Sequence, residues 1–131
     1  MSQQDKVCLI VDDNEFERAK MRRVMRAYCP EMQMIIARSV AEAMEKLEKR
    51  DVAIMFLEND LPDGNGTEMA MRLATDKDLG TTPVILFGDN PTPFMFAKAK
   101  TARNVREIWK KRDFSGPGVQ RALEQHVRHA S

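Results

Sequence analysis

The fold is indicated first by residues 7–14, which read Val-Cys-Leu-Ile-Val-Asp-Asp-Asn. The five apolar residues have the length of a strand, and an unbroken apolar run is typical of a parallel strand covered on both faces. The run stops abruptly at two acids and an amide. We therefore expect a buried strand whose carboxyl end carries polar side chains.

The same alternation of apolar runs and helical patterns continues along the chain. Ser39 and Glu42 have the spacing of a helix capping box. Further strands are expected at residues 34–37, 52–57, 83–87 and 105–109, and helices at 15–28, from 40 onward, at 67–74, at 94–103 and around 119–127. Five strand–helix units predict an α/β domain with a parallel sheet, helices on both faces, and a functional crevice at the carboxyl ends of the strands.

Length and composition fit one globular domain spanning residues 1–131, and we expect no separate output domain. Hydrophobic residues make up 43% of the chain, and the net charge of +1 gives no overall attraction to nucleic acid or anionic lipid. No apolar run reaches the length of a membrane span. The two cysteines make no disulfide framework and no leader peptide is evident, so a cytoplasmic protein is predicted.

Acids follow two of the predicted strands. Asp12 and Asp13 end the strand at 7–11, and Glu58 ends the strand at 52–57. With strand order 2-1-3-4-5 these ends are neighbours, so three carboxylates lie close together and repel unless a cation neutralises them. Oxygen ligands of this kind suit Mg²⁺. A solvated acidic rim without metal is the alternative.

The sequence resembles the receiver domain of two-component response regulators. The resemblance covers nearly the whole chain and rests on residues 9–14, on the Leu-Pro-Asp-Gly-x-Gly loop at 61–66, and on Pro-Val-Ile-Leu at 83–86. It implies a flavodoxin-like (βα)5 doubly wound sheet of order 2-1-3-4-5. It also implies Mg²⁺ held by Asp12, Asp13 and the backbone carbonyl of Asp60, and phosphoryl transfer from a histidine kinase or phosphotransfer protein to an aspartate after the third strand.

Two positions depart from that family pattern at the centre of the expected site. Counting four residues back from Pro62 places Glu58 where the family has the acceptor aspartate. Glutamate carries its carboxylate about 1.5 Å further into the pocket, and in-line transfer tolerates misplacement badly. Gly88 stands where the family has a threonine or serine, so no hydroxyl is offered to a phosphoryl group.

The lysine that the family places after the fifth strand has three candidates. Spacing from Gly88 favours Lys110, followed by Lys111, whereas anchoring on Phe114 favours Arg112. We prefer a lysine because its amine is the compact charge that the family uses for phosphate. The aromatic switch residue expected three positions earlier is also missing.

These departures predict a degenerate receiver, or pseudo-receiver, that is not an enzyme and acts by protein–protein contact. One alternative is an active response regulator phosphorylated at Glu58 or Asp60. A second alternative is a Mg²⁺-dependent phosphoryl-handling enzyme, although no nucleophile elbow or phosphate-binding glycine loop is present.

Charge distribution indicates where partners bind. Residues 94–131 hold nine bases and three acids. The resemblance implies that the face formed by helix 4, strand 5 and helix 5 contacts a signalling partner or a second copy of the chain. We expect no nucleic-acid or membrane partner. Either one of Phe94 and Phe96 is exposed as a contact for a partner, or both pack at the start of the helix, and His126 and His129 are expected to be solvated.

Overall fold

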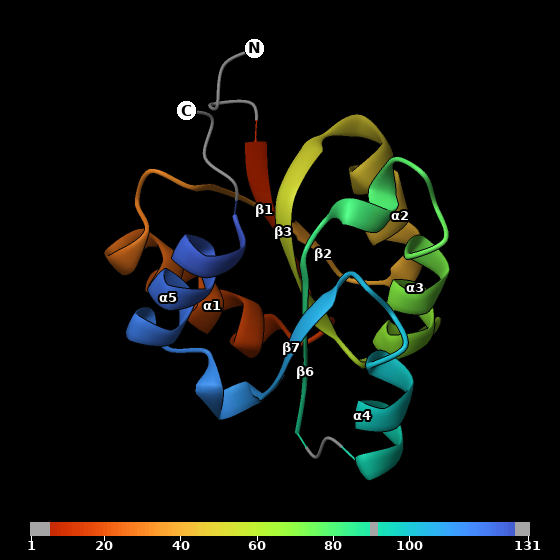
Figure 1. The fold of residues 1–131 in the computed structure, drawn as a ribbon. Coiled ribbons are helices and arrows are strands. Elements are labelled where there is room, and N and C mark those ends of the chain that lie inside the picture. The colour runs from red at the N-terminus through yellow and green to blue at the C-terminus, as the bar shows by residue number, and fades with distance from the viewer. Residues whose placement is uncertain (1–5, 90–91, 128–131) are drawn as a thin grey trace.

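The computed structural model describes residues 6–89 and 92–127. Figure 1 shows a central sheet between two layers of helices. The sheet consists of β1 (Lys6–Val11), β2 (Gln33–Ala37), β3 (Asp51–Glu58), β6 (Val84–Gly88) and β7 (Val105–Lys110). The helices are α1 (Glu15–Tyr28), α2 (Val40–Lys49), α3 (Gly66–Leu73), α4 (Pro93–Ala99) and α5 (Gly116–His126).

The sheet is parallel throughout, with the order β2-β1-β3-β6-β7. Because β6 and β7 are its fourth and fifth strands along the chain, this order confirms the predicted 2-1-3-4-5 arrangement. A small antiparallel hairpin, β4 (Asp60–Leu61) and β5 (Gly64–Asn65), interrupts the loop after β3. Two short 3-10 turns, η2 (Leu79–Thr81) and η3 (Lys111–Asp113), precede β6 and α5.

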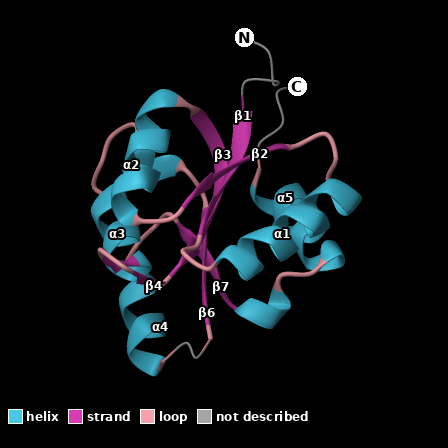
Figure 2. Ribbon diagram, turned by 180° about the vertical axis from the view of Figure 1, so that it is seen from behind, coloured by secondary structure: helices cyan, strands magenta, loops and turns pink. Residues whose placement is uncertain are grey.

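Both faces of the sheet are buried, which explains the unbroken apolar runs of its strands. Figure 2 shows α1 and α5 on one face and α2, α3 and α4 on the other. Successive side chains of β1 alternate between the two faces, so Cys8 and Ile10 join the α1–α5 core while Leu9 and Val11 join the opposite core. The same alternation continues in β3 and β6.

Helix boundaries agree with the sequence patterns except at α4. The predicted helix at 94–103 ends at Ala99, because the hydroxyl of Thr101 donates to the carbonyl of Lys98 at 2.6 Å and caps the last turn. The buried side chain of Asn104 then donates to the carbonyl of Ala70 in α3 at 3.0 Å. This contact directs the chain back to the sheet as β7. In the described part of the chain, no helix has the length and apolar character needed to cross a membrane.

Candidate functional site

The carboxyl ends of β1 and β3 bring two buried acids to the predicted crevice. Asp12 follows β1 and is 0% exposed. Its Oδ1 accepts a hydrogen bond from the backbone N–H of Asn14 at 2.9 Å, whereas its Oδ2 is buried without a partner. Burial raises the pKa of Asp12, and the Asn14 hydrogen bond and the charge of Lys111 only partly oppose that shift. Asp12 is therefore a buried acid with one oxygen that accepts no hydrogen bond.

Glu58 ends β3 and forms an ion pair with Lys111. The distance from Lys111 Nζ to Glu58 Oε1 is 2.9 Å, and the two side chains are only 16% and 4% exposed. Glu58 Oε2 accepts from the backbone N–H of Asn59 at 2.7 Å. Burial raises the pKa of Glu58 against the opposing effect of Lys111. The pKa of Lys111 is also raised, since its contact with Glu58 outweighs its own burial, so the ammonium stays charged.

The basic residue in the pocket is Lys111, and the preference that spacing gives to Lys110 is wrong. Lys110 pairs with Gly88 in the sheet register, but its side chain is exposed. The backbone N–H of Lys110 donates to Asp113 Oδ2 at 2.9 Å, which closes the turn η3 immediately after β7. This turn brings the next residue toward Glu58. Arg112 is exposed and lies outside the pair.

Gly88 lies beside Glu58 at the end of β6. A Cβ atom at this position would stand 3.6 Å from Glu58 Oε2, which is an ordinary van der Waals contact. A side chain at position 88 would therefore face the Glu58 carboxylate, and glycine places no hydroxyl there.

The end of β3 is held firmly by the loop that follows it. Asn59 Oδ1 accepts from both the hydroxyl and the backbone N–H of Thr67, at 2.7 and 3.1 Å. Gly66 donates its N–H to the carbonyl of Asn59 at 2.8 Å. A Cβ at Gly66 would lie only 2.5 Å from the carbonyl oxygen of Glu58, so this close approach of backbones requires glycine.

The residues predicted for magnesium differ in their exposure and in their contacts. Asp13 and Asp60 are exposed, and both oxygens of Glu58 are engaged. Within residues 6–89 and 92–127, no three carboxylate, imidazole or thiol groups could hold a metal ion. Asp12 Oδ2 is the one buried orphan oxygen of the site, and the Lys111 ammonium already supplies a cation there. The Mg²⁺ site formed by Asp12, Asp13 and the backbone carbonyl of Asp60 stays a prediction.

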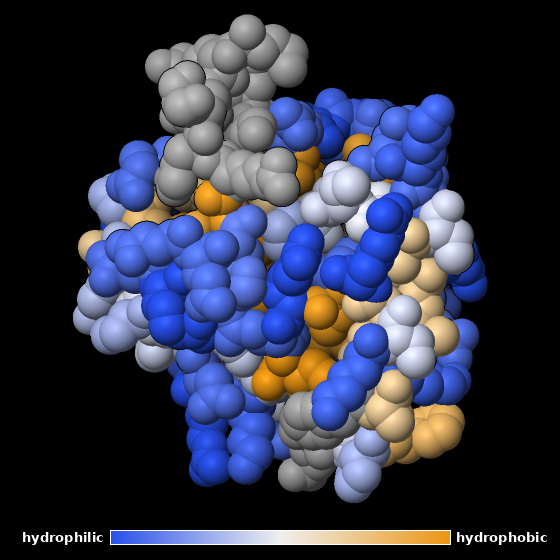
Figure 3. All heavy atoms as spheres, in the orientation of Figure 1, coloured by the Kyte–Doolittle hydropathy of each residue, from blue (hydrophilic) through white to orange (hydrophobic). Residues whose placement is uncertain are grey.

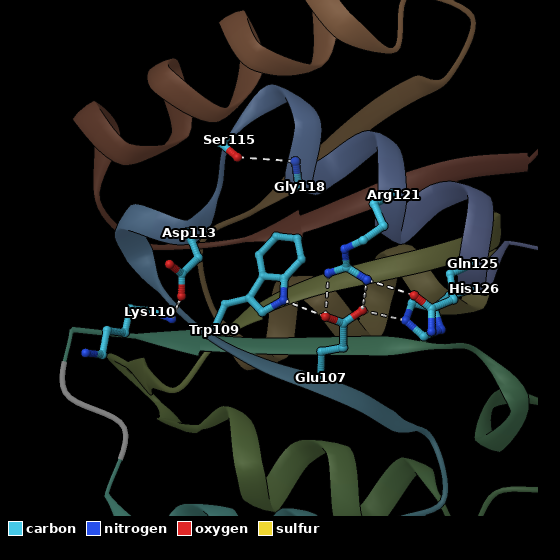
Figure 4. Close-up of polar contacts among 9 residues, drawn as sticks. All are labelled: Glu107, Trp109, Lys110, Asp113, Ser115, Gly118, Arg121, Gln125 and His126. Atoms are coloured by element: carbon cyan, nitrogen blue, oxygen red, sulfur yellow. Dashed lines mark hydrogen bonds and ion pairs between the residues drawn. The ribbon is translucent and has the colours of Figure 1, made fainter.

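A polar network on β7 and α5 is absent from the sequence predictions. Glu107 binds the guanidinium of Arg121 through two contacts of 2.7 and 3.1 Å and accepts from Trp109 Nε1 at 2.9 Å (Figure 4). The ring of His126 lies 2.6 Å from Glu107 Oε2, and its side chain is 11% exposed. The expectation of a solvated His126 is wrong, because the C-terminal turn of α5 packs over β7. His129 lies outside the described residues.

The hydrogen bonds to Glu107 shift its titration strongly. Its contact with Arg121 is the main cause that lowers the pKa of Glu107, to about 2. Nothing in a single sequence marks a glutamate on a strand as the partner of an arginine fourteen positions later, so this network follows only from the tertiary structure.

Comparison with known proteins gives one family and many similar structures. The family model described as "Response regulator receiver domain" matches residues 8–115. No curated protein matched the sequence. The matching structures include the signal receiver domain of an HD domain-containing protein from Pseudomonas fluorescens Pf-5, with a TM-score of 0.82 and 20% identity, covering 96% of this chain and 89% of that one.

Two further structures resemble the chain at a similar level. The Mn²⁺-bound form of response regulator Rcp1 has a TM-score of 0.80 and 19% identity, covering 96% of this chain and 97% of that one. A CheY-like receiver domain protein from Methanospirillum hungatei JF-1 has a TM-score of 0.78 and 18% identity, covering 92% and 95%. Likeness at such identities shows a common fold.

Proposed function

The chain belongs to the response regulator receiver domain family, and on this premise we propose that it is a receiver-like module without ordinary aspartyl phosphorylation. In this proposal it passes signals by contact with another signalling protein. The observation that carries the proposal is the ion pair of 2.9 Å between Lys111 and Glu58, the residue that the family resemblance puts at the acceptor position.

An acceptor needs a carboxylate oxygen that is free to attack phosphorus. In Glu58, Oε1 contacts the Lys111 ammonium and Oε2 accepts from the backbone of Asn59. Phosphoryl transfer depends on positioning and on charge stabilisation, and here the stabilising cation is already paired. Gly88 adds no hydroxyl to compensate. The Glu58 carboxylate is thus already paired with a cation before any phosphoryl donor arrives.

The cation role in this pocket falls to Lys111 in our proposal. A divalent ion would have to compete with the ammonium, and its carboxylate ligands among the described residues would be limited to Asp12 and the exposed Asp13. We propose that the fold keeps the acidic pocket of the family as a structural feature, with the charge of Lys111 built into the chain.

The partner surface that we propose is the face formed by α4, β7 and α5. A shallow groove of about 190 Å³ there is lined by Ala99, Lys100, Val105, Arg106, Glu107 and Ile108. Figure 3 shows hydrophobic surface in the middle of this face with hydrophilic residues around it. Phe94 is 67% exposed, and Lys98 Nζ lies 5.0 Å from the centre of its ring. An acidic protein segment with apolar side chains fits this combination.

The proposal is tested by restoring the two residues that the family uses. The double variant Glu58→Asp/Gly88→Thr shortens the acid and adds a hydroxyl, and the space beside Glu58 accepts a Cβ at position 88. We expect this variant to take up one phosphoryl group from acetyl phosphate with Mg²⁺, while the original chain takes up none. Glu48→Asp, on the exposed surface of α2, is the matched control and should behave as the original chain.

Peptide mapping of the modified site decides between the alternatives. Modification of the original chain at Glu58 or Asp60 would show an active response regulator with an unusual acceptor and would contradict the proposal. A double variant that folds but stays unmodified would also contradict it, since Glu58 and Gly88 would not then be the obstacle.

A further inference from the structure

A second polar cavity lies near the amino ends of the strands, at the opposite end of the sheet from Asp12 and Glu58. It has a volume of about 560 Å³ and is formed by the start of β3, the segment from η2 to β6, the start of β7 and the end of α5. This size lies within the range of about 300–1,000 Å³ found for small-molecule sites. The proposed function makes no use of this cavity.

Two arginines line the cavity. Arg103 and Arg106 are exposed, and neither makes an ion pair with an acid anywhere in residues 6–89 and 92–127. Arg103 is positioned by η2, because its Nη2 atom lies only 2.9 Å from where a Cβ of Gly80 would stand. Two unneutralised guanidinium groups beside one cavity fit an anion with several oxygens, such as a phosphate ester.

The sheet itself is distorted where it borders the cavity. The register of β1 with β3 shifts so that Ala53 is an extra residue, and the register of β6 with β7 shifts so that Arg106 is an extra residue. Both extra residues line the cavity. Bulges redirect side chains and are frequent next to binding sites. Two independent bulges therefore shape the wall and turn Arg106 toward this space.

The end of α5 contributes the imidazole ring of His126 to the cavity, and the network of Figure 4 holds this ring. His126 lines the cavity, and its contact of 2.6 Å with Glu107 keeps the ring in place. Glu107 is fixed in turn by the two contacts with Arg121. The exposed part of this fixed ring, 11% of the side chain, is a surface against which a planar base can pack.

The remaining polar groups suit a ligand with hydroxyl and amino groups. Asp51 and Asp78 also line the cavity and are exposed acceptors, and Thr81 and Thr82 add hydroxyl groups. Because the two acids would repel a bare phosphate, the cavity is not suited to binding a small anion alone. They would accept hydrogen bonds from a sugar hydroxyl or from an exocyclic amino group.

We infer that this cavity binds a nucleoside monophosphate. In this assignment Arg103 and Arg106 hold the phosphate, His126 stacks on the base, and Asp51 with Asp78 accepts from the hydroxyl and amino groups. Binding here is separate from the Glu58–Lys111 pocket, so this inference and the proposed lack of phosphorylation fail or succeed independently, although Arg106 also lines the proposed partner groove.

The test is titration of the full chain, labelled with ¹⁵N, with AMP, GMP, CMP and UMP, with adenosine and inorganic phosphate as comparison ligands. We expect saturable amide shifts for at least one nucleotide at residues 51–53, 80–82 and 103–107. Arg103→Gln/Arg106→Gln should weaken that binding about tenfold or more, because it removes charge-assisted hydrogen bonds to phosphate. Arg23→Gln/Arg26→Gln removes equal charge from the exposed face of α1 and should leave binding unchanged.

Three results would overturn the inference. The first is an absence of saturable shifts with all four nucleotides. The second is equal nucleotide affinity in the Arg103→Gln/Arg106→Gln variant, with a dispersed spectrum that shows it is folded. The third is binding of inorganic phosphate as tight as that of the nucleotides, which would leave the base and sugar without a role.

Discussion

Glu58 and Lys111 form an ion pair that solvent reaches only slightly, and its energetics differ from those of a surface pair. Removing two charges from water costs about as much as their attraction returns, so such a pair adds little net stability. Breaking it is expensive, because the remaining charge is buried alone. The pair therefore fixes the charges of Glu58 and Lys111. Substituting either residue should change the measured stability of the protein.

Lys111→Met is expected to lower the free energy of unfolding by about 3 kcal/mol, since it leaves the Glu58 carboxylate buried without its partner. Urea unfolding at neutral pH measures the change. Lys110→Met serves as the control, because that side chain is exposed, and should change stability by less than about 0.5 kcal/mol.

The double variant Glu58→Gln/Lys111→Met completes the cycle. It should recover most of the stability lost in Lys111→Met, because no unpaired charge remains in the pocket. If the stability loss in the double variant equals the sum of the losses in Lys111→Met and Glu58→Gln, the two side chains are not coupled. The description of the pocket would then be incorrect.

Asp12 is expected to destabilise the folded state at neutral pH. Burial raises its pKa above the ordinary value of 3.8, so the folded chain holds a proton there more tightly than the unfolded chain does. Stability from this group is present below the unfolded pKa and is lost as the pH rises through the folded pKa. Asp12→Asn should therefore stabilise the protein by about 1 kcal/mol at pH 7, or ~4 °C in Tm.

Thermal unfolding of the Asp12→Asn variant across pH gives the check. The stabilisation should shrink toward acid pH, where Asp12 is protonated in both states. A variant that is less stable than the original chain at pH 7 would show that the carboxylate is held by a partner not seen among the described groups.

At the scale of elements, β7 and α5 are tied together by Glu107. Its pKa is lowered to about 2, first by the hydrogen bond with Arg121, so its contribution to stability is present above the unfolded pKa of 4.5. That contribution is lost as the pH falls from about 4.5 toward 2. β7 and α5 belong to the partner face proposed above. The contacts of Glu107 with Arg121 hold this strand and this helix in one arrangement.

Glu107→Gln is expected to cost about 2 kcal/mol at pH 7, with allowance for partial exposure, and to flatten the loss of stability at acid pH. Chemical unfolding at pH 7 and at pH 3 measures both effects. Glu124→Gln, on the exposed side of α5, is the control. An equal loss of unfolding free energy at both pH values would contradict an ionic contribution from Glu107, because such a contribution must fade as Glu107 takes up a proton.

Strands β1, β3 and β6 could be predicted from sequence because they are buried on both faces and therefore read as continuous apolar runs, whereas the strand order followed from the family resemblance. The end of β3 at Glu58 and the bare backbone at Gly88 follow from residue identity alone. The choice between Lys110 and Lys111 could not be made in this way, because the turn η3 decides which side chain enters the pocket. His126 was misjudged for a similar reason, since its burial depends on how α5 crosses β7.

At the scale of the whole molecule, the chain has the receiver fold, and in our proposal its site does not carry out phosphoryl transfer. Residues 94–131 hold nine bases against three acids, and several of these bases lie on or near the proposed partner face. A module of this kind holds one charge state in its pocket and presents one surface to its partner. Its signal would then depend on the amount of the protein and on its partner, with no cycle of phosphorylation.

The central claim concerns whether the unmodified chain accepts a phosphoryl group at all. Intact-protein mass spectrometry after incubation with acetyl phosphate and Mg²⁺ tests it most directly, with a phosphorylatable receiver domain treated in parallel. The account predicts a single species at the unmodified mass while the parallel sample gains one phosphoryl group. A second species carrying one acid-stable, base-labile phosphoryl group on this chain would contradict it.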